Sequence, residues 1–262
     1  MYRAYRHIAA SRRGRILTLT LDNPPLNAVN RALHDELSHI FHDVARDDGS
    51  DVIVLTGAGK AFSAGADLEE MKRATEDPAL RSTLMSRAPH IVHALLALDK
   101  PVIARLNGHA MGLGATLALL CDVVIAADIA RIADPHVGIG LSAGDGGALI
   151  WPHLIGYARA RHHLLSGEAL SATEAAAIGL IHKAVPPTAL DAAVDSYADR
   201  LASGAILAIR ATKRSINMAL CREAIASTEA HIGLEALTMA SNDHREAVLA
   251  FLEKRPPVFT GT

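Results

Sequence analysis

The chain has 262 residues, 50% of them hydrophobic, and its formal net charge is −2 at pH 7. This length can bury one large core, and the near-neutral charge argues against a nucleic-acid partner or a membrane surface. No apolar run approaches the ~18 residues of a membrane-spanning helix, and the two cysteines, Cys121 and Cys221, indicate a cytoplasmic protein without disulfides.

The first half of the chain alternates between predicted strands and helices. Four strands are predicted before residue 130, at residues 15–21, 51–56, 101–104 and 123–127. Asn30 is the expected N-cap of a helix that runs to about Ala45, and a second helix is expected over residues 77–98. Because helices separate the strands, we expect parallel pairing and an α/β fold.

The second half is expected to be mainly helical. Residues 129–147 are irregular and rich in glycine. Helices are predicted at residues 153–165, at residues 171–178 after a capping box, and from residue 190 onward with a joint near Gly204. A short strand is expected near Val185.

The stretch from Asn107 to Asp122, NGHAMGLGATLALLCD, lies between two of the predicted strands. A strand, a glycine-rich turn and a helix start leave unpaired backbone N–H groups that point into open space. Such donors suit an anion, or an oxygen that becomes negative during a reaction. This stretch therefore predicts a site that stabilises negative charge.

Three blocks of sequence are specific enough to indicate a family: LTGAGKAFSAGADLEEM (55–71), KPVIARLNGHAMGLGATLALLCD (100–122) and GEALSATEAAAIGLI (167–181). With these blocks the chain resembles the crotonase superfamily, that is, the enoyl-CoA hydratase/isomerase family, over nearly its whole length. The resemblance implies an α/β spiral of ββα turns over residues 1–203 and a helical trimerisation region over residues 204–262. It also implies a homotrimer or a dimer of trimers.

The same resemblance implies an acyl-CoA thioester as substrate, with CoA arriving as part of it and no metal or redox cofactor. The backbone amides of Ala66 and Leu113 would form an oxyanion hole for the thioester oxygen. The implied substrate-binding residues are Asn27, Ala28, Ala64, Gly65, Ala66, Asp67, Leu68, Gly112, Leu113, Lys254 and Phe259.

The chain departs from the family at the positions for acid–base catalysis. Hydratases of this family carry two glutamates that deliver water across a double bond, but this chain has Thr116 and His136 there. A threonine hydroxyl can orient water, whereas a histidine, with an unperturbed pKa near ~6.5, can exchange protons. Asp145 follows His136 in a glycine-rich loop, and this pattern resembles 6-oxocamphor hydrolase, a carbon–carbon hydrolase of the same superfamily. We therefore predict that Asp145, then His136, transfer protons, with Thr116 assisting.

Three functions stay open at this point. The favoured one is an acyl-CoA enzyme of the enoyl-CoA hydratase/isomerase type. The second is a hydrolase that cleaves a carbon–carbon bond of β-diketones with His136 and Asp145, and the third is a non-catalytic acyl-CoA-binding protein, since both glutamates are missing. Among other residues, Asp122 is expected to bond backbone across the spiral, Trp151 to lie in the core and Glu235 to lie on a helix surface.

Overall fold

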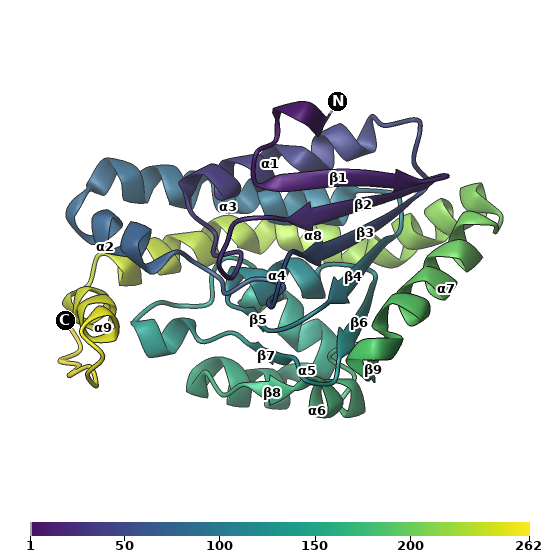
Figure 1. Cartoon of the computed structure of the whole chain (residues 1–262). Coiled ribbons are helices and arrows are strands. Elements are labelled where there is room, and N and C mark those ends of the chain that lie inside the picture. The colour runs from purple at the N-terminus through teal and green to yellow at the C-terminus, as the bar shows by residue number, and fades with distance from the viewer. Residues whose placement is uncertain (1) are drawn as a thin grey trace.

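The computed structural model describes residues 2–262 and contains two sheets covered by helices (Figure 1). The larger sheet has the strand order β1-β2-β3-β4-β6-β9. These strands are β1 (Ile8–Arg13), β2 (Ile16–Leu21), β3 (Val52–Gly57), β4 (Val102–Leu106), β6 (Val123–Ala127) and β9 (Lys183–Val185). The smaller sheet contains, in order, β5 (Ala110–Met111), β7 (Arg131–Ala133) and β8 (Leu170–Ser171).

Strand pairing confirms the parallel arrangement predicted from the sequence. The strands β2, β3, β4 and β6 pair in parallel in chain order, and β9 adds to the same edge in parallel. The prediction missed β1, which pairs with β2 in antiparallel fashion at the other edge. Only the first residue of β1 is buried, so its sequence IAASRR carries no alternating pattern that would mark a strand.

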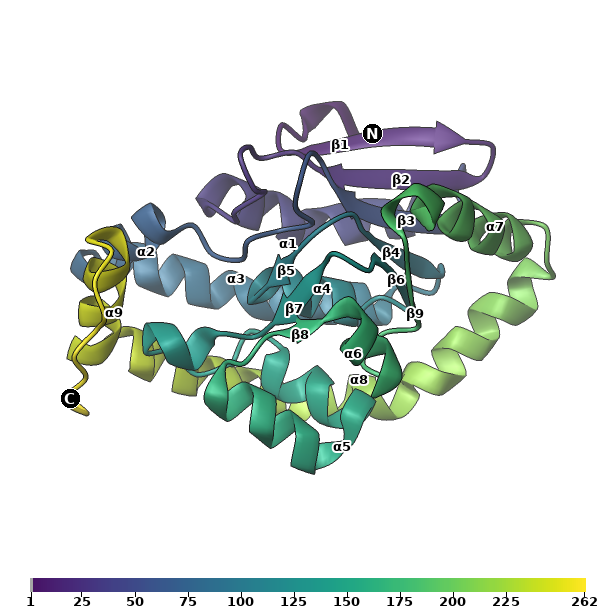
Figure 2. The same cartoon turned by 60° about the horizontal axis from the view of Figure 1, so that its bottom comes forward.

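Helices cover both faces of the large sheet. The helices of the structure are α1 (Arg31–Ala45), α2 (Leu68–Glu76), α3 (Pro78–Ala97), α4 (Leu113–Leu119), α5 (Gly147–Ser166), α6 (Ala172–Ala177), α7 (Leu190–Ala202), α8 (Ile206–Met239) and α9 (Asn242–Leu252). Helix α1 packs against α3, and the long α8 runs along α3 beyond it, whereas α7 packs on the opposite face of the sheet (Figures 1 and 2). The larger of the two main apolar cores lies on the α1 and α3 side and includes Trp151, which is fully buried as predicted.

Local capping explains where several helices begin. The side chain of Asn30 accepts a hydrogen bond from the Leu33 amide, and that of Asp67 accepts one from the Glu70 amide at the start of α2. The cap at Asn30 was predicted. Asp122 also bonds as predicted, since its Oδ2 accepts a hydrogen bond of 2.7 Å from the Val102 amide across the spiral.

The segment expected to be irregular is more ordered than predicted. It contains β7 and a 3-10 turn, η2 (His136–Ile139), and α5 begins at Gly147 rather than at residue 153. Pro152 lies inside α5, so the proline removes one backbone donor without ending the helix. Helix α5 instead bends at Gly156, which has φ 76°.

The C-terminal part is helical, and the predicted joint near Gly204 lies between the end of α7 and the start of α8. Helix α9 and the C-terminus lie at one end of the molecule, beside α2 (Figure 1). Within residues 2–262, no helix is both long and apolar enough to cross a membrane.

Candidate active site

Two glycine-rich loops meet beside the carboxyl ends of the parallel strands. The Ser63 carbonyl accepts a hydrogen bond of 3.0 Å from the Met111 amide, and Ser63 and Ala110 form a parallel β-bridge. Gly65 has φ +81°, and a Cβ atom there would lie 2.6 Å from the Met111 carbonyl oxygen. Only glycine therefore allows the loops to approach this closely.

This contact places the amides of Ala66 and Leu113 at one buried cavity of about 40 Å³. Within residues 2–262, neither amide donates a hydrogen bond to the protein, because Leu113 is the first residue of α4 and Ala66 lies outside the strands. The polar side chains that line the cavity are His34, Asp67, Glu70, His136, Asp145 and Glu235. Its apolar lining comes from Val29, Met71, Leu84, Met85 and Ala88.

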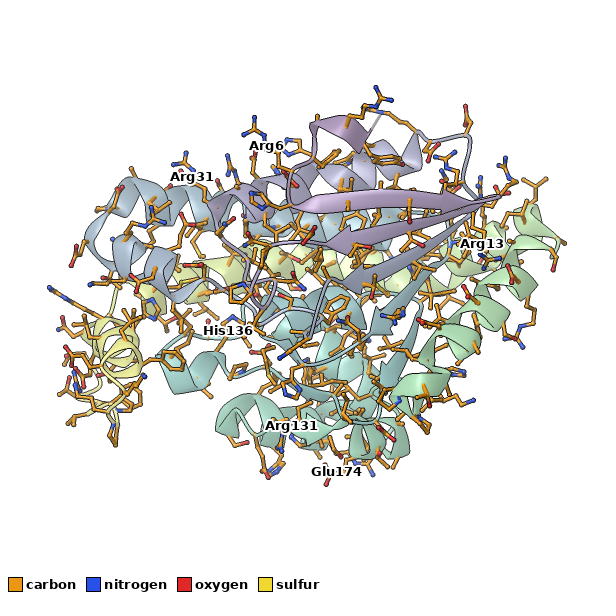
Figure 3. The ribbon with its side chains drawn as sticks, in the orientation of Figure 1. Arg6, Arg13, Arg31, Arg131, His136 and Glu174 are labelled. Atoms are coloured by element: carbon orange, nitrogen blue, oxygen red, sulfur yellow. The ribbon has the colours of Figure 1, made fainter. Side chains whose placement is uncertain are left out.

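His136 lies between two carboxylates at this cavity (its position is labelled in Figure 3). Its Nδ1 contacts Asp134 Oδ1, and its Nε2 lies 3.5 Å from Asp145 Oδ2. Burial disfavours the charged imidazolium, but the charges of Asp134 and Asp145 outweigh it and hold the pKa of His136 well above its usual value. The two carboxylates thus favour the protonated form of the imidazole, and Asp134 orients its ring.

Asp145 is held from the other side by Thr116, whose Oγ1 donates a hydrogen bond of 3.3 Å to Asp145 Oδ1. Burial, with the Asp134 charge adding to it, raises the pKa of Asp145 above its ordinary value, although His136 and the Thr116 hydrogen bond act in the opposite direction. A carboxylate with a raised pKa is a better proton acceptor than an ordinary one. The structure thus brings together all three side chains predicted for proton transfer.

Glu235 belongs to this cluster, and the prediction of a helix-surface position was wrong. Its side chain is 3% exposed, lines the cavity from α8 and has an Oε2 with no hydrogen-bond partner among the described residues. Burial, then the nearby Asp145 charge, raises the pKa of Glu235 to about 8. Glu235 is therefore a neutral acid at pH 7.

Asp134 and Glu235 were not proposed as site residues from the sequence. Asp134 lies two positions before His136, so the Asp-Pro-His spacing could have indicated it. Glu235 gives no such signal, because it lies far along the chain on α8. Its role depends on the burial of one face of that helix, which the local sequence does not show. Gly144 shows how closely the two elements approach, since a Cβ there would lie 2.9 Å from Glu235 Oε2.

Asp134, His136 and Asp145 offer three atoms within 4.8 Å of one another that could bind a metal ion. A metal ion needs a free nitrogen lone pair on the imidazole. The Nδ1 of His136 contacts Asp134, so the nitrogen that could bind an ion is Nε2, which lies 3.5 Å from Asp145 Oδ2.

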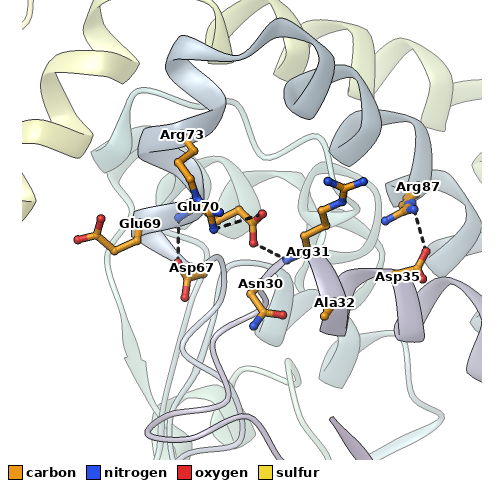
Figure 4. A pocket seen from close by; sticks show the side chains of 9 residues that line it. All are labelled: Asn30, Arg31, Ala32, Asp35, Asp67, Glu69, Glu70, Arg73 and Arg87. Carbon is orange, nitrogen blue, oxygen red and sulfur yellow. Dashed lines mark hydrogen bonds and ion pairs between the residues drawn. The ribbon is translucent and has the colours of Figure 1, made fainter. Parts of the chain in front are cut away.

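An open pocket of about 600 Å³ adjoins the buried cavity and shares Asp67 and Glu70 with it (Figure 4). Arg31, Arg73 and Arg87 point into or across this pocket. Glu70 accepts a hydrogen bond from the Arg31 amide and lies 3.6 Å from the Arg73 guanidinium. The start of α2 therefore separates a charged outer pocket from a small inner cavity.

The remaining predicted binding residues fall into three groups. Those of the two loops, Ala64, Gly65, Leu68 and Gly112, lie next to the cavity, and a Cβ at Gly112 would lie 3.5 Å from the His136 ring. Asn27 supports the first loop, since its side chain donates hydrogen bonds to the carbonyls of residues 58 and 61, and Ala28 follows it directly in the chain. Lys254 and Phe259 are exposed near the C-terminus and are not among the residues that line the cavity.

Fold and sequence together define the class of protein. A parallel-rich sheet, a second small sheet and a helical C-terminal region form the crotonase fold, and a crystal structure described as an enoyl-CoA hydratase/isomerase from Mycobacterium paratuberculosis matches it with a TM-score of 0.88. That match has 34% sequence identity and covers 93% of this chain and 97% of the other. The chain belongs to the enoyl-CoA hydratase/isomerase family, whose family model matches residues 11–262.

Two relatives with known names come from Escherichia coli. A 2,3-dehydroadipyl-CoA hydratase is 36% identical, with 97% of this chain and 98% of that protein covered. A 1,2-epoxyphenylacetyl-CoA isomerase is also 36% identical, with 94% and 95% covered. These similarities confirm an enzyme of the crotonase type, and the two names span a hydration and an isomerisation.

Proposed function

We propose that this protein acts on an acyl-CoA thioester and stabilises its enolate with the amides of Ala66 and Leu113. The observation that carries the proposal is the placement of two unpaired amides in one cavity with a buried acid–base cluster. Loss of one such donor costs typically ~3 kcal/mol of barrier. The side chain of Leu113 is buried and leaves the amide free to bind an oxyanion.

Proton transfer in this proposal belongs to Asp145 and Glu235. Asp145 takes a proton from the substrate or from water, and His136, held by Asp134, stabilises the carboxylate by its charge. Glu235 holds a proton at neutral pH and donates it to the substrate in the complementary proton-transfer step. These steps are the chemistry of hydration and isomerisation alike, and they need no redox cofactor.

The relatives support acyl-CoA as the substrate class, since both names are those of CoA thioester enzymes. The small cavity of about 40 Å³ favours a short acyl group. In this proposal CoA lies along residues 27–28 and 64–68, and Lys254 and Phe259 contact the CoA of a neighbouring subunit. Neither residue lines the cavity of its own chain, which is the reason for assigning them to the neighbour.

A homotrimer or dimer of trimers is part of the proposal. Helix α8 carries exposed apolar side chains that a monomer would leave in water: Leu207, Ile216, Met218, Ile225, Leu234 and Leu237. Light scattering coupled to size-exclusion chromatography measures the oligomer directly, and a monomer would contradict this part. The free cysteines Cys121 and Cys221 support a cytoplasmic location.

A second candidate function is hydrolytic cleavage of a carbon–carbon bond in a β-diketone. The position of His136 between two carboxylates favours it, because such a pair can position water for attack on a carbonyl. The bond between the attacked carbonyl carbon and the central carbon then breaks, its electron pair forms an enolate, and Glu235 protonates that carbon. A third reading, a non-catalytic acyl-CoA-binding protein, rests on the absence of the two glutamates of family hydratases.

One screen separates these functions. Wild type and Asp145→Asn are incubated with a series of acyl-CoA thioesters, including crotonyl-CoA, and with cyclic β-diketones, and products are followed by mass spectrometry. Turnover of a thioester that Asp145→Asn abolishes supports the proposal. Turnover of diketones alone supports the hydrolase, and CoA binding by calorimetry without any turnover supports the non-catalytic protein. Unchanged turnover by Asp145→Asn would refute the assignment of Asp145.

A further inference from the structure

His34 is a buried polar residue in the cavity that the proposed reaction does not use. It lies in the second turn of α1, is 7% exposed and lines the cavity that holds Ala66 and Leu113. Its Nδ1 is fully buried and has no hydrogen-bond partner among residues 2–262. Buried polar groups are nearly always hydrogen-bonded, so this nitrogen indicates a contact that the protein itself does not make.

Burial and the nearby charges determine the protonation state of His34. Burial, then the positive charge of Arg87 on α3, lowers the pKa of His34 to about 4. His34 is therefore neutral at pH 7 and offers one donor and one acceptor nitrogen. Arg87 itself is paired with Asp35 at 2.9 Å on the side of the open pocket, as Figure 4 shows.

The rest of the cavity determines what His34 can bind. Asp67, Glu70 and Asp145 line it together with His136, so three carboxylates face one imidazole and an anionic group on the acyl chain would meet net negative charge. A purely apolar acyl group would leave the His34 nitrogen without a partner. The ligand that satisfies both conditions is neutral and carries an oxygen.

We propose that His34 forms a hydrogen bond with a neutral oxygen on the acyl group, a hydroxyl or a carbonyl, and so selects oxygenated acyl groups over plain alkyl ones. This inference rests on the proposed function, in which the acyl group occupies the cavity. It adds a specificity-determining residue that is separate from the acid–base cluster. A site built to bond an oxygen discriminates strongly against an analogue that lacks it.

The test compares binding of butyryl-CoA, 4-hydroxybutyryl-CoA and acetoacetyl-CoA by calorimetry, and thereby distinguishes a hydroxyl from a carbonyl. Wild type is expected to bind at least one oxygenated thioester on the order of tenfold more tightly than butyryl-CoA. His34→Leu should remove this preference while keeping butyryl-CoA binding, and His34→Gln, which keeps a hydrogen-bonding group, should restore part of it. Ser38→Ala is the matched control, because Ser38 is buried on the same helix and bonds the Asp35 carbonyl rather than the cavity.

The outcomes separate the two proposals. Binding of all three thioesters with equal affinity, or an unchanged preference in His34→Leu, overturns the role of His34 and leaves the acyl-CoA function intact. Failure of all three to bind wild type overturns the acyl-CoA function. In that case the same variants are tested with cyclohexane-1,3-dione, and equal binding of this diketone by wild type and His34→Leu overturns the role of His34 as well. Circular dichroism of each variant verifies that it is folded.

Discussion

Replacement of Glu235 by glutamine separates its role as an acid from its role in packing. Burial, then the Asp145 charge, raises the pKa of Glu235 from 4.5 to about 8, so Glu235 holds its proton at pH 7. Glutamine has nearly the same shape but cannot give up a proton. A positioned general acid contributes about 10²–10⁴ to a rate, so Glu235→Gln is expected to lower kcat by that factor.

The assay is the dependence of kcat on pH between 6 and 10, measured with the thioester or diketone that wild type consumes. Wild type should lose activity about tenfold per pH unit above the pKa of Glu235, near pH 8, and the variant should show no such decline. Glu229→Gln, an exposed position on the same helix, is the control and should behave like wild type. The reasoning is refuted if Glu235→Gln keeps the wild-type kcat, or if the decline near pH 8 survives in it.

A second readout of the same group needs no substrate. Because the folded pKa is raised, the folded chain binds the Glu235 proton more tightly than the unfolded chain between pH 4.5 and about 8. Stability that this proton contributes is therefore present at low pH and is lost as the pH rises through that window. Urea unfolding at several pH values should show this loss in wild type and a flatter profile in Glu235→Gln.

Three further predictions concern the contacts around the site. Thr116→Val removes a hydrogen bond that lowers the pKa of Asp145, so the acidic limb of the kcat/KM profile should move to higher pH, and an unmoved limb would contradict the contact. Gly65→Ala places a Cβ 2.6 Å from a carbonyl oxygen at φ +81°, and urea unfolding should report a loss of more than about 2 kcal/mol. Lys213→Met removes a buried ammonium 2.7 Å from Asp122 Oδ2, and it should cost about 2 kcal/mol, seen as a lower Tm; an unchanged Tm would show that the pair is neutral to stability.

The features that the sequence predicted correctly depend on local physics. The N-cap at Asn30 depends on its own side chain and on the amide three residues later, which are close together in the sequence. The parallel strands β3, β4 and β6 are short apolar runs between helices, and that pattern is also local. The family resemblance then supplied what the pattern alone could not, the meeting of the two glycine-rich loops.

The features that the sequence did not reveal depend on distant contacts. Glu235 stands in a helical stretch whose pattern favours a surface position, and its burial follows from the packing of α8 against the loop at Gly144. His34 likewise looks like an ordinary polar residue of an amphipathic helix until the cavity beside it is known. Strand β1 was missed because only its first residue is buried, so its sequence has no alternation of apolar and polar residues.

Helix α8 carries both Glu235, which lines the cavity, and exposed apolar side chains on the surface of the molecule. Glu235 faces inward, while Leu234 and Leu237, close by along the helix, are 57% and 69% exposed. Any protein surface that covers these leucines would therefore contact α8 within one helical turn of Glu235. In the proposed trimer, a subunit contact and the proposed proton donor would share this turn of α8.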